Sequence, residues 1–372
     1  MRWRTVGILA VVAAISLALA AWAWMSARAP LKVEGVGELL LPSLRRHLEE
    51  AARIEIRRGD EMLVVRRARD AWVAGEADFP VHPAQVKSVL LTLAEMKKAR
   101  PATARAEKYR FIFVDEPNPE SLATRVVVKD KRGRVLADVI LGREAPDWLG
   151  GGREAQFARV HEEKRAWLVE GRVRAPVRVE GWADNQLVRL PEDSVAEVVI
   201  RHGDGEVLRL KPNPEPKKAG DVVGLPLVLE DMPPGAKPNV ANIRALFYSL
   251  TDLSFNDVRK ARPDLKPLAE VRVRTKGGLA LVWQVVRDKA GYWLRGTLER
   301  AGKDKRLAEK LSKLLPGREF GVYDSVGKVF SSRLEDLIEA EAVDLGGAAS
   351  SAGSRAGKGG GAGVEGKTGA RK

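Results

Sequence analysis

The sequence contains no cysteine, which excludes disulfide bonds, thiolate metal sites, cysteine nucleophiles and the acylated cysteine of a lipoprotein. Histidine is scarce too, and no two of its four residues have the spacing of metal ligands. Surface positions are expected for all four. A Gly-x-Ser-x-Gly nucleophile motif and an ATP-binding loop are absent. We therefore expect no catalytic residue, no cofactor and no metal, and predict a protein that is not an enzyme. The histidines are His47, His82, His161 and His202.

Long uncharged apolar runs are absent except at the start of the chain. Residues 6–25 carry no charge, and only Gly7 and Ser16 interrupt their apolar side chains. A helix of about 20 residues is about 30 Å long, the thickness of a bilayer's hydrocarbon core. Tryptophan, which prefers the headgroup region, lies at both ends of this run. The pattern predicts a transmembrane anchor that contacts lipid through Trp3, Val6, Leu9, Trp22 and Trp24.

The charges beside this run orient it only weakly, because Arg2 and Arg4 precede it while Arg28 and Lys32 follow it. Few residues would remain in the cytoplasm if the amino terminus stayed there. That simpler topology predicts a single-pass protein of the inner (cytoplasmic) membrane with the bulk of the chain in the periplasm. The alternative is a cleaved signal peptide, since Ala18-Leu19-Ala20 fits signal peptidase, although the run continues beyond the usual length of such peptides.

The formal net charge is +14, from 64 Lys and Arg against 50 Asp and Glu. Such a balance favours anionic partners such as lipid headgroups or phosphate-bearing polymers. However, basic and apolar residues alternate, as in Val271-Arg272-Val273-Arg274, which is typical of the solvated face of a sheet. The basic residues are not clustered with aromatic ones, so we expect no nucleic-acid partner.

The second half of the chain repeats the first. Residues 54–60 align with residues 198–204 at an offset of about 144 positions, and Leu63 then aligns with Val207. Each half continues into a helix with one apolar face. The pattern predicts an α+β fold, in which an N-terminal transmembrane helix precedes a duplicated unit of antiparallel β-sheet with packed helices. The helix positions expected to correspond are Val86, Val89, Leu93 and Met96 in the first half and Val240, Ile243, Phe247 and Leu250 in the second.

This organisation divides the chain into six parts. We expect the membrane anchor in residues 1–30, a stalk or short helix in 31–52, the first α+β repeat in 53–190, the second repeat in 191–300 with a proline-rich insertion at 212–238, a C-terminal helical segment in 301–345, and a disordered Gly/Ala/Lys tail in 346–372.

Two tryptophans in polar loops, Trp148 and Trp182, form a candidate contact surface for a glycan or a peptide. Other tryptophans lie in or beside apolar strand patterns, where packing in the core is the expected role. These are Trp72, Trp167, Trp283 and Trp293.

Five segments carry a recognisable pattern. They are Phe79-Pro80-Val81, the helix of Gln85 to Lys97, the strand ending Val139-Ile140-Leu141-Gly142, the segment Ala166-Trp167-Leu168-Val169, and the run from Trp182 to Leu190. Together they resemble the domain-of-unknown-function family 4340. The resemblance covers most of residues 50–340. The chain departs from the family's frequent Gly-Leu-x-x-Pro step before the strand near Arg125, where it has Glu116-Pro117-Asn118-Pro119.

Members of that family are envelope proteins, often associated with an ABC exporter of the gliding-motility type and its auxiliary subunit. The resemblance therefore implies a non-catalytic accessory or scaffold subunit of an ABC transport system, with the permease and auxiliary subunits as partners. It carries no established catalytic residue to this chain. An alternative is a periplasmic binding module for cell-envelope polymer or anionic lipid, which the net charge and the loop tryptophans suggest. An envelope hydrolase would need a clustered pocket of His, Asp and Glu.

Overall fold

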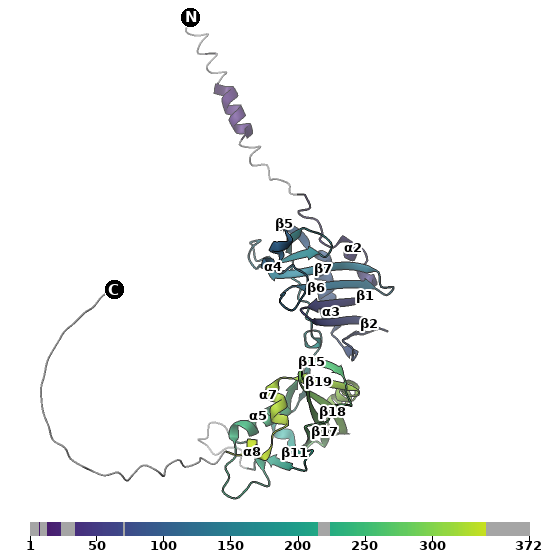
Figure 1. The fold of residues 1–372 in the computed structure, drawn as a ribbon, viewed down its shortest axis with the longest axis vertical. Coiled ribbons are helices and arrows are strands. Elements are labelled where there is room, and N and C mark those ends of the chain that lie inside the picture. The colour runs from purple at the N-terminus through teal and green to yellow at the C-terminus, as the bar shows by residue number, and fades with distance from the viewer. Residues whose placement is uncertain (1–6, 8–12, 24–33, 70, 215–223, 340–372) are drawn as a thin grey trace, which may run out of the picture.

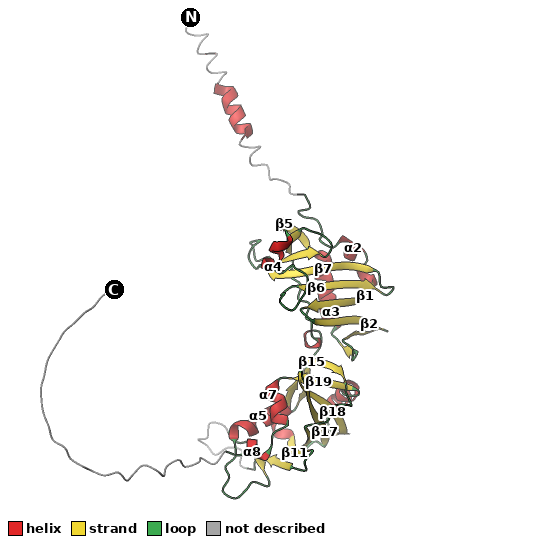
Figure 2. Ribbon diagram, viewed as in Figure 1, coloured by secondary structure: helices red, strands yellow, loops and turns green. Residues whose placement is uncertain are grey.

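The structure is a computed structural model, and it describes residues 7, 13–23, 34–69, 71–214 and 224–339. Two large antiparallel sheets dominate this part of the chain, and they lie one above the other along the long axis of the molecule (Figure 1). Helices are few and short beside the strands (Figure 2). The chain therefore has the mixed α+β class and the antiparallel sheets that the sequence predicts.

The first sheet contains nine strands within the described residues, in the order β4-β3-β2-β1-β6-β7-β8-β9-β5. Its strands are β1 (Ala51–Arg58), β2 (Glu61–Ala68), β3 (Ala71–Ala74), β4 (Phe79–Pro80), β5 (Lys97–Pro101), β6 (Thr124–Asp130), β7 (Val135–Glu144), β8 (Ala155–Val160) and β9 (Ala166–Glu170). The helices of this unit are α2 (Pro42–Arg46), η1 (Leu48–Glu50), α3 (Pro83–Glu95), η2 (Ala106–Lys108) and α4 (Tyr109–Ile112).

The second sheet has eight strands in the described part of the chain, in the order β13-β12-β11-β16-β17-β18-β19-β15. They are β11 (Val195–His202), β12 (Val207–Pro212), β13 (Leu227–Leu229), β15 (Asp257–Lys260), β16 (Ala269–Thr275), β17 (Leu279–Asp288), β18 (Gly291–Ala301) and β19 (Arg318–Val322). A separate pair joins β10 (Gln186–Arg189) to β14 (Asp252–Ser254). The helices are η3 (Val179–Gly181), η4 (Glu192–Ser194), α5 (Val240–Thr251), α6 (Lys305–Leu314), α7 (Asp324–Phe330) and α8 (Leu334–Leu337).

The two sheets share one topology. Apart from the extra edge strand β4, each strand of the first sheet has a counterpart ten labels later at the same place in the second sheet. The ladders agree residue by residue: Ile56 pairs with Val126 in the first sheet, as Ile200 pairs with Val271 in the second. The duplication that the sequence pattern predicts is thus visible in the order and register of the strands.

The register corrects one detail of the repeat. Ile56 pairs with Leu63, whereas Ile200 pairs with Leu208, so Leu208 and not Val207 is the counterpart of Leu63. The hairpin of the second unit contains one more turn residue, and Gly205 within it has a positive φ of 100°. A residue without a Cβ adopts that conformation at little cost, which allows the longer turn.

The helix faces also shift from the expected alignment. Helix α3 buries Val86, Val89, Leu90, Leu93 and Ala94, and α5 buries Ile243, Leu246, Phe247, Leu250 and Thr251, so the same spacing recurs with Ile243 matching Val86. Val240, which the sequence pattern placed on the buried face, is exposed. It is the first residue of the helix, where the cap residue Asn239 accepts a hydrogen bond from the backbone N–H of Asn242.

Other segments are organised differently from the expectation. The segment expected as a stalk or short helix does contain the short helix α2, but it packs onto the first unit: Leu44 in α2 is fully buried, and Leu40 donates its backbone N–H to the carbonyl oxygen of Met96. The proline-rich segment 212–238 contributes the edge strand β13, paired with β12. The second sheet extends past residue 300, since β19 is one of its strands. The C-terminal segment expected to be helical contains the separate helices α6, α7 and α8, with β19 between α6 and α7.

The inner faces of both sheets belong to one hydrophobic cluster, in which Val139 and Leu141 of β7 lie with Trp283 and Val285 of β17. The first unit has a second, smaller cluster on its outer face. There Tyr109, Val114 and Ala123 cover Ile140 and Phe157. We call residues 102–123, which supply this layer, the cover segment. In the second unit the corresponding strands β15 and β16 are joined by the shorter segment 261–268, and among the described residues no second apolar cluster lies on that face.

Candidate functional site

The residues expected to anchor the chain fall largely outside the described residues: Trp3, Val6, Leu9 and Trp24 are not among them. Trp22 belongs to the helical residues 13–23, and its side chain is exposed. In the described part of the chain, no helix is both long and apolar enough to cross a membrane. The tail at 346–372 also lies outside the described residues.

The two candidate contact tryptophans have different environments. Trp148 is 52% exposed and packs edge-to-face on Phe157, with ring centroids 5.6 Å apart. Trp182 is only 1% exposed, and its indole Nε1 donates to the carbonyl oxygen of Pro176 at 2.8 Å. The expectation of a contact role for Trp182 is therefore wrong, because its ring is buried while polar neighbours such as Asp184 face outward. Trp148 remains available to a partner.

Trp182 lies where the two units meet. Its carbonyl accepts a hydrogen bond from the backbone N–H of His82, which precedes α3. Nearby, Phe79 of β4 meets Phe255 and Phe320 of the second unit at centroid distances of 5.2 and 6.1 Å. All three rings are 1% exposed or less. Aromatic rings in such contacts add to the free energy of burial, so apolar packing joins the two units.

Arg318 reinforces this joint. From β19 its Nε and Nη2 donate to the carbonyl oxygens of Ala77 and Asp78 in the first unit, and its guanidinium lies 5.8 Å from the centroid of Phe79. Burial lowers the pKa of Arg318, because desolvation disfavours the charged form. The same physical cause raises the pKa of Asp257, in the edge strand β15 that faces the first unit.

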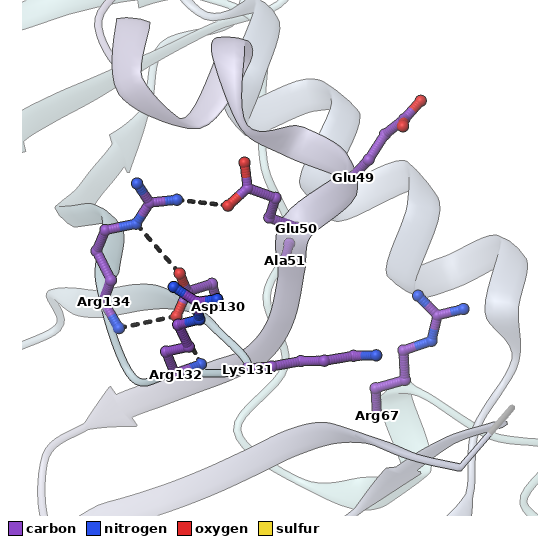
Figure 3. A pocket seen from close by; sticks show the side chains of 8 residues that line it. All are labelled: Glu49, Glu50, Ala51, Arg67, Asp130, Lys131, Arg132 and Arg134. Carbon is purple, nitrogen blue, oxygen red and sulfur yellow. Dashed lines mark hydrogen bonds and ion pairs between the residues drawn. The ribbon is translucent and has the colours of Figure 1, made fainter.

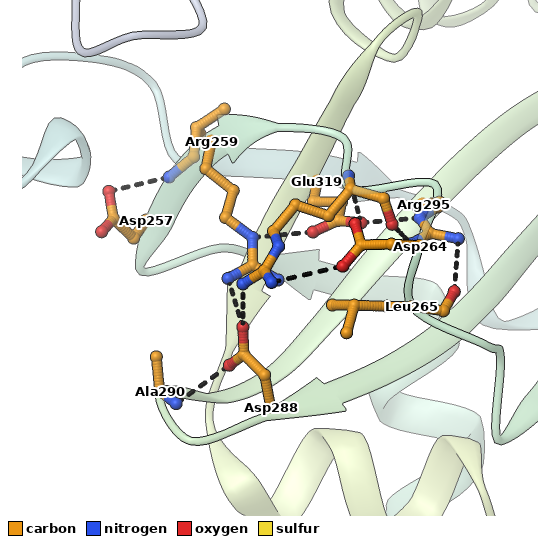
Figure 4. A network of polar contacts seen from close by, with 10 residues as sticks. Asp257, Arg259, Asp264, Leu265, Asp288, Ala290, Arg295 and Glu319 are labelled. Carbon is orange, nitrogen blue, oxygen red and sulfur yellow. Dashed lines mark hydrogen bonds and ion pairs between the residues drawn. The ribbon is translucent and has the colours of Figure 1, made fainter.

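A buried polar network lies on the outer face of the second sheet (Figure 4). The carboxylate of Glu319 has no exposed side-chain area, and it accepts from Nε of Arg259 at 2.7 Å and Nε of Arg295 at 2.6 Å. Arg259 also donates to Asp288 at 2.6 Å, and its guanidinium lies 3.8 Å from the centroid of Trp293. Burial opposes ionisation of Asp288, but the hydrogen bonds from Arg259 and from the backbone N–H of Ala290, together with the positive charge of Arg259, outweigh it and hold the pKa of Asp288 below its usual value.

The first sheet carries its own polar cluster on the same face. Arg159 is buried and donates to the carbonyl oxygens of Val114 and His161 and to the carboxylate of Glu116. Asp138 is held by both Nε and Nη2 of Arg125, at 2.8 and 2.6 Å. Each carboxylate here is engaged by an arginine, so these groups are arranged as structural ion pairs.

The histidines do not come together. His202 is buried, contrary to the expected surface position, and its Nε2 lies 3.0 Å from the carbonyl oxygen of Ser332. His47 lies beside Glu50, and His161 has carboxylate oxygens of Glu116 and Asp138 within 3.6 Å. Among the described residues no group of three or more His, Asp or Glu is placed to hold a metal ion.

A hollow of 560 Å³ lies beside the turn between β6 and β7 (Figure 3). At this turn Arg134 donates to Asp130 at 3.1 Å and to Glu50 at 2.5 Å. Burial opposes ionisation of Asp130, but hydrogen bonds from the backbone N–H groups of Arg134 and Arg132 outweigh it, so the pKa of Asp130 is lowered. Three carboxylates, including Glu49, thus share the hollow with four cationic side chains. The remaining lining residues are Ala51, Arg67 and Lys131.

Sequence reasoning missed Arg159, Arg259, Arg295 and Glu319. Each is a charged residue in or beside a strand, and such a residue usually faces solvent. Only the strand register, which brings Glu319 beside Arg259, places these charges together in the interior.

The comparisons with known proteins place the chain in a family. No curated protein matches the sequence. The family model described as "Domain of unknown function (DUF4340)" matches residues 72–271, which is more than half of the chain and extends from β3 of the first unit to β16 of the second. This protein therefore belongs to the DUF4340 family.

Proposed function

We propose that this protein is a single-pass, membrane-anchored scaffold of the cell envelope, held in the inner membrane by residues 1–30 with its two sheet units in the periplasm. It acts as a non-catalytic accessory subunit beside the permease and auxiliary subunits of an ABC transport system. The resemblance of its sequence to envelope proteins of such systems motivates the transporter partner.

The observation that carries this proposal is the joint between the two units. Phe79, Phe255 and Phe320 pack together without solvent exposure, and Arg318 bridges from the second unit to backbone carbonyls of the first. Close-packed interiors of this kind resist relative motion of their parts. A stiff body of two similar halves suits a protein that holds other subunits in place. The carboxylates of the two buried polar clusters, Glu116, Asp138, Asp288 and Glu319, are partners of arginines, which favours a structural role for them.

The proposal is tested by co-purification. The full chain with a carboxyl-terminal affinity tag is isolated in several mild detergents, and a permease and a nucleotide-binding subunit are sought by mass spectrometry. Their joint recovery is expected. A matched preparation with Leu9, Leu17 and Leu19 replaced by Arg controls for the anchor, since charges at those positions disfavour insertion. Recovery of neither subunit in any detergent contradicts the transporter role.

The orientation has its own test. Alkaline phosphatase, which is active in the periplasm, and green fluorescent protein, which fluoresces in the cytoplasm, are fused to the carboxyl end. Active phosphatase and a dark fluorescent protein are expected. A fluorescent fusion, or release of the full chain into buffer without detergent, contradicts the anchored periplasmic topology.

A second role is the binding of cell-envelope polymer or anionic lipid. Its support is the net charge of +14 together with the exposed ring of Trp148. Retention on anionic glycan or lipid surfaces is expected to fall as salt rises, because ions screen exposed charges. Retention that does not depend on salt, or no retention at all, contradicts this role.

A further inference from the structure

A second hollow, of 520 Å³, lies beside the turn between β16 and β17. We call it the second-unit pocket. Its charged lining consists of four cationic side chains, Arg272, Arg274, Lys276 and Arg300, and one carboxylate, Glu299. The hollow occupies the same turn of the second unit as the hollow at the β6–β7 turn occupies in the first, since β16 and β17 are the counterparts of β6 and β7.

The strand register explains the hollow. Arg274 pairs with Ala280, and Ala280 pairs on its other side with Arg300. Residues in register on neighbouring strands point to the same face of a sheet, so a methyl group lies between two long cationic side chains. Arg272, two residues before Arg274, is on that face as well. The small side chain of Ala280 leaves the floor of the hollow low, and the arginines form its walls.

The cations in this pocket are only partly neutralised. Arg272 donates to Glu299 at 2.8 Å, and Arg274 pairs with Glu197 at 2.9 Å. Lys276 and Arg300 have no ion-pair partner within the described residues. Two positive charges therefore face the hollow without a compensating carboxylate.

The first unit has carboxylates at two positions where the second unit has hydroxyl groups. Asp130 and Thr275 are equivalent residues, because each ends its strand and pairs with the first residue of β1 or β11, namely Ala51 or Val195. Asp130 Oδ1 accepts from the backbone N–H of Arg134, and Thr275 Oγ1 accepts in the same way from Leu279. The hydroxyl keeps the turn but brings no negative charge.

A second carboxylate is replaced in the same way. Glu50, which precedes β1 and pairs with Arg134, has Ser194 as its counterpart before β11. In the first unit these two carboxylates neutralise Arg134, whose counterpart in the second unit is the apolar Leu279. In the second unit both carboxylate positions carry hydroxyl groups, so neither supplies a negative charge to Lys276 or Arg300. The two units therefore share the conformation of the turn but differ in the charge that these two positions carry.

We propose that the second-unit pocket binds a phosphate group. Near neutral pH a phosphate group carries about −1.5 to −2 charges as a monoester and about −1 as a diester, and in both forms it offers strong acceptor oxygens to the two uncompensated cations. Arginine is well suited to phosphate because its planar guanidinium can donate two parallel hydrogen bonds. The pocket is large enough to admit the phosphate together with the group that bears it. This inference rests on the anion-binding role proposed above and names its site.

Titration calorimetry of the full chain in a zwitterionic detergent tests the site. The probes are inorganic phosphate and glycerophosphoglycerol, the deacylated headgroup of phosphatidylglycerol. Saturable binding of at least one probe is expected. Thr275→Asp, which supplies the carboxylate of the first unit, and Lys276→Gln are each expected to weaken binding about tenfold or more, because they remove attraction at short range.

Two matched variants serve as controls. Thr275→Asn keeps an acceptor for the N–H of Leu279 without adding a charge, and Lys131→Gln removes the equivalent lysine of the first unit. Both are expected to leave the affinity within about twofold of the wild type, because neither changes the charge of the second-unit pocket. Circular dichroism of every variant checks that the sheets are intact.

The outcomes separate the possibilities. Binding of inorganic phosphate alone identifies a soluble phosphate as the ligand, and binding of glycerophosphoglycerol identifies a lipid headgroup. No saturable binding of either probe overturns the inference, as does equal weakening by Lys131→Gln and Lys276→Gln. If neither phosphate probe binds the wild-type chain, and the Thr275→Asp variant is retained on anionic surfaces as well as the wild type, the anion-binding role proposed above stands and this site is refuted.

Discussion

Arg159 and Arg295 are equivalent residues of the two sheets. Arg159 pairs in register with Ile140 of β7, and Arg295 pairs with Gln284 of β17. Each guanidinium donates to backbone carbonyls of the segment that leads from the edge strand back into the sheet: Arg159 to Val114, and Arg295 to Leu265 and Arg262. The same side chain thus fastens a long segment in one unit and a short one in the other.

We expect Arg295→Met to lower the free energy of unfolding by about 3–5 kcal/mol, because it removes one partner from the fully buried carboxylate of Glu319. Urea unfolding followed by tryptophan fluorescence measures the change. Arg57→Met, at an exposed position in β1, is the control and is expected to change stability by less than about 0.5 kcal/mol. A loss below about 1 kcal/mol for Arg295→Met contradicts the structural role.

Asp288→Asn tests the pH dependence of the same network. The pKa of Asp288 is lower in the folded chain than the unfolded value of about 3.9, so its carboxylate stabilises the fold above that pH. This contribution is lost as the pH falls through the lower, folded pKa. The variant is therefore expected to be less stable than the wild type at pH 7, and the difference is expected to shrink below about pH 4.

Urea unfolding at pH 7, 5 and 3 measures this difference. Asp231→Asn, at an exposed position, is the control for removal of a carboxylate. A difference between Asp288→Asn and the wild type that stays constant across this pH range contradicts the linkage.

Phe255→Ala tests the joint between the units. The ring is 1% exposed and contacts both Phe79 and Phe320, so its removal is expected to cost about 3–5 kcal/mol. Limited proteolysis is expected to cut the variant faster between the units, near residues 172–186. Phe111→Ala, whose ring is 60% exposed, is the matched control with little expected effect. Equal proteolysis of the two variants would show that the joint is held by other contacts.

The two candidate contact tryptophans, Trp148 and Trp182, are expected to differ in how much stability the protein loses when each is replaced by alanine. Trp182→Ala removes a ring that is 1% exposed and a hydrogen bond to Pro176, and we expect a loss of about 3–5 kcal/mol. Trp148→Ala loses one edge-to-face contact with Phe157, which is worth about 0.5–1.5 kcal/mol. Differential scanning calorimetry compares their melting temperatures. Similar shifts for both variants are the result that contradicts these placements.

Much of the fold follows from patterns of neighbouring residues. Alternation in β1, where Ile54 and Ile56 are buried between charged residues, is a local signal, and its recurrence at Val198 and Ile200 predicts the duplication. The residue-by-residue alignment of the two halves is harder to predict from sequence, because one additional residue in the second hairpin makes Leu208 the counterpart of Leu63. Such a change follows from turn geometry and not from hydrophobic periodicity.

The candidate sites depended on contacts that no local pattern contains. Trp182 is surrounded in sequence by polar residues, yet the joint between the units buries it. Arg318 and Ala77 lie far apart in the chain, and their hydrogen bond exists only because the two units meet. The missing negative charge at Thr275 is recognised only by comparison with Asp130, and the strand register is needed to show that the two positions are equivalent.

The cover segment has a consequence for how the two copies can diverge. Residues 102–123 pack on the outer face of the first sheet through apolar side chains, so a ligand that approaches this side contacts the cover segment and not the strands beneath it. In the second copy the equivalent connection is the shorter segment 261–268, and arginine side chains line the second-unit pocket. The two copies therefore share one backbone arrangement but offer different surface chemistry to a ligand.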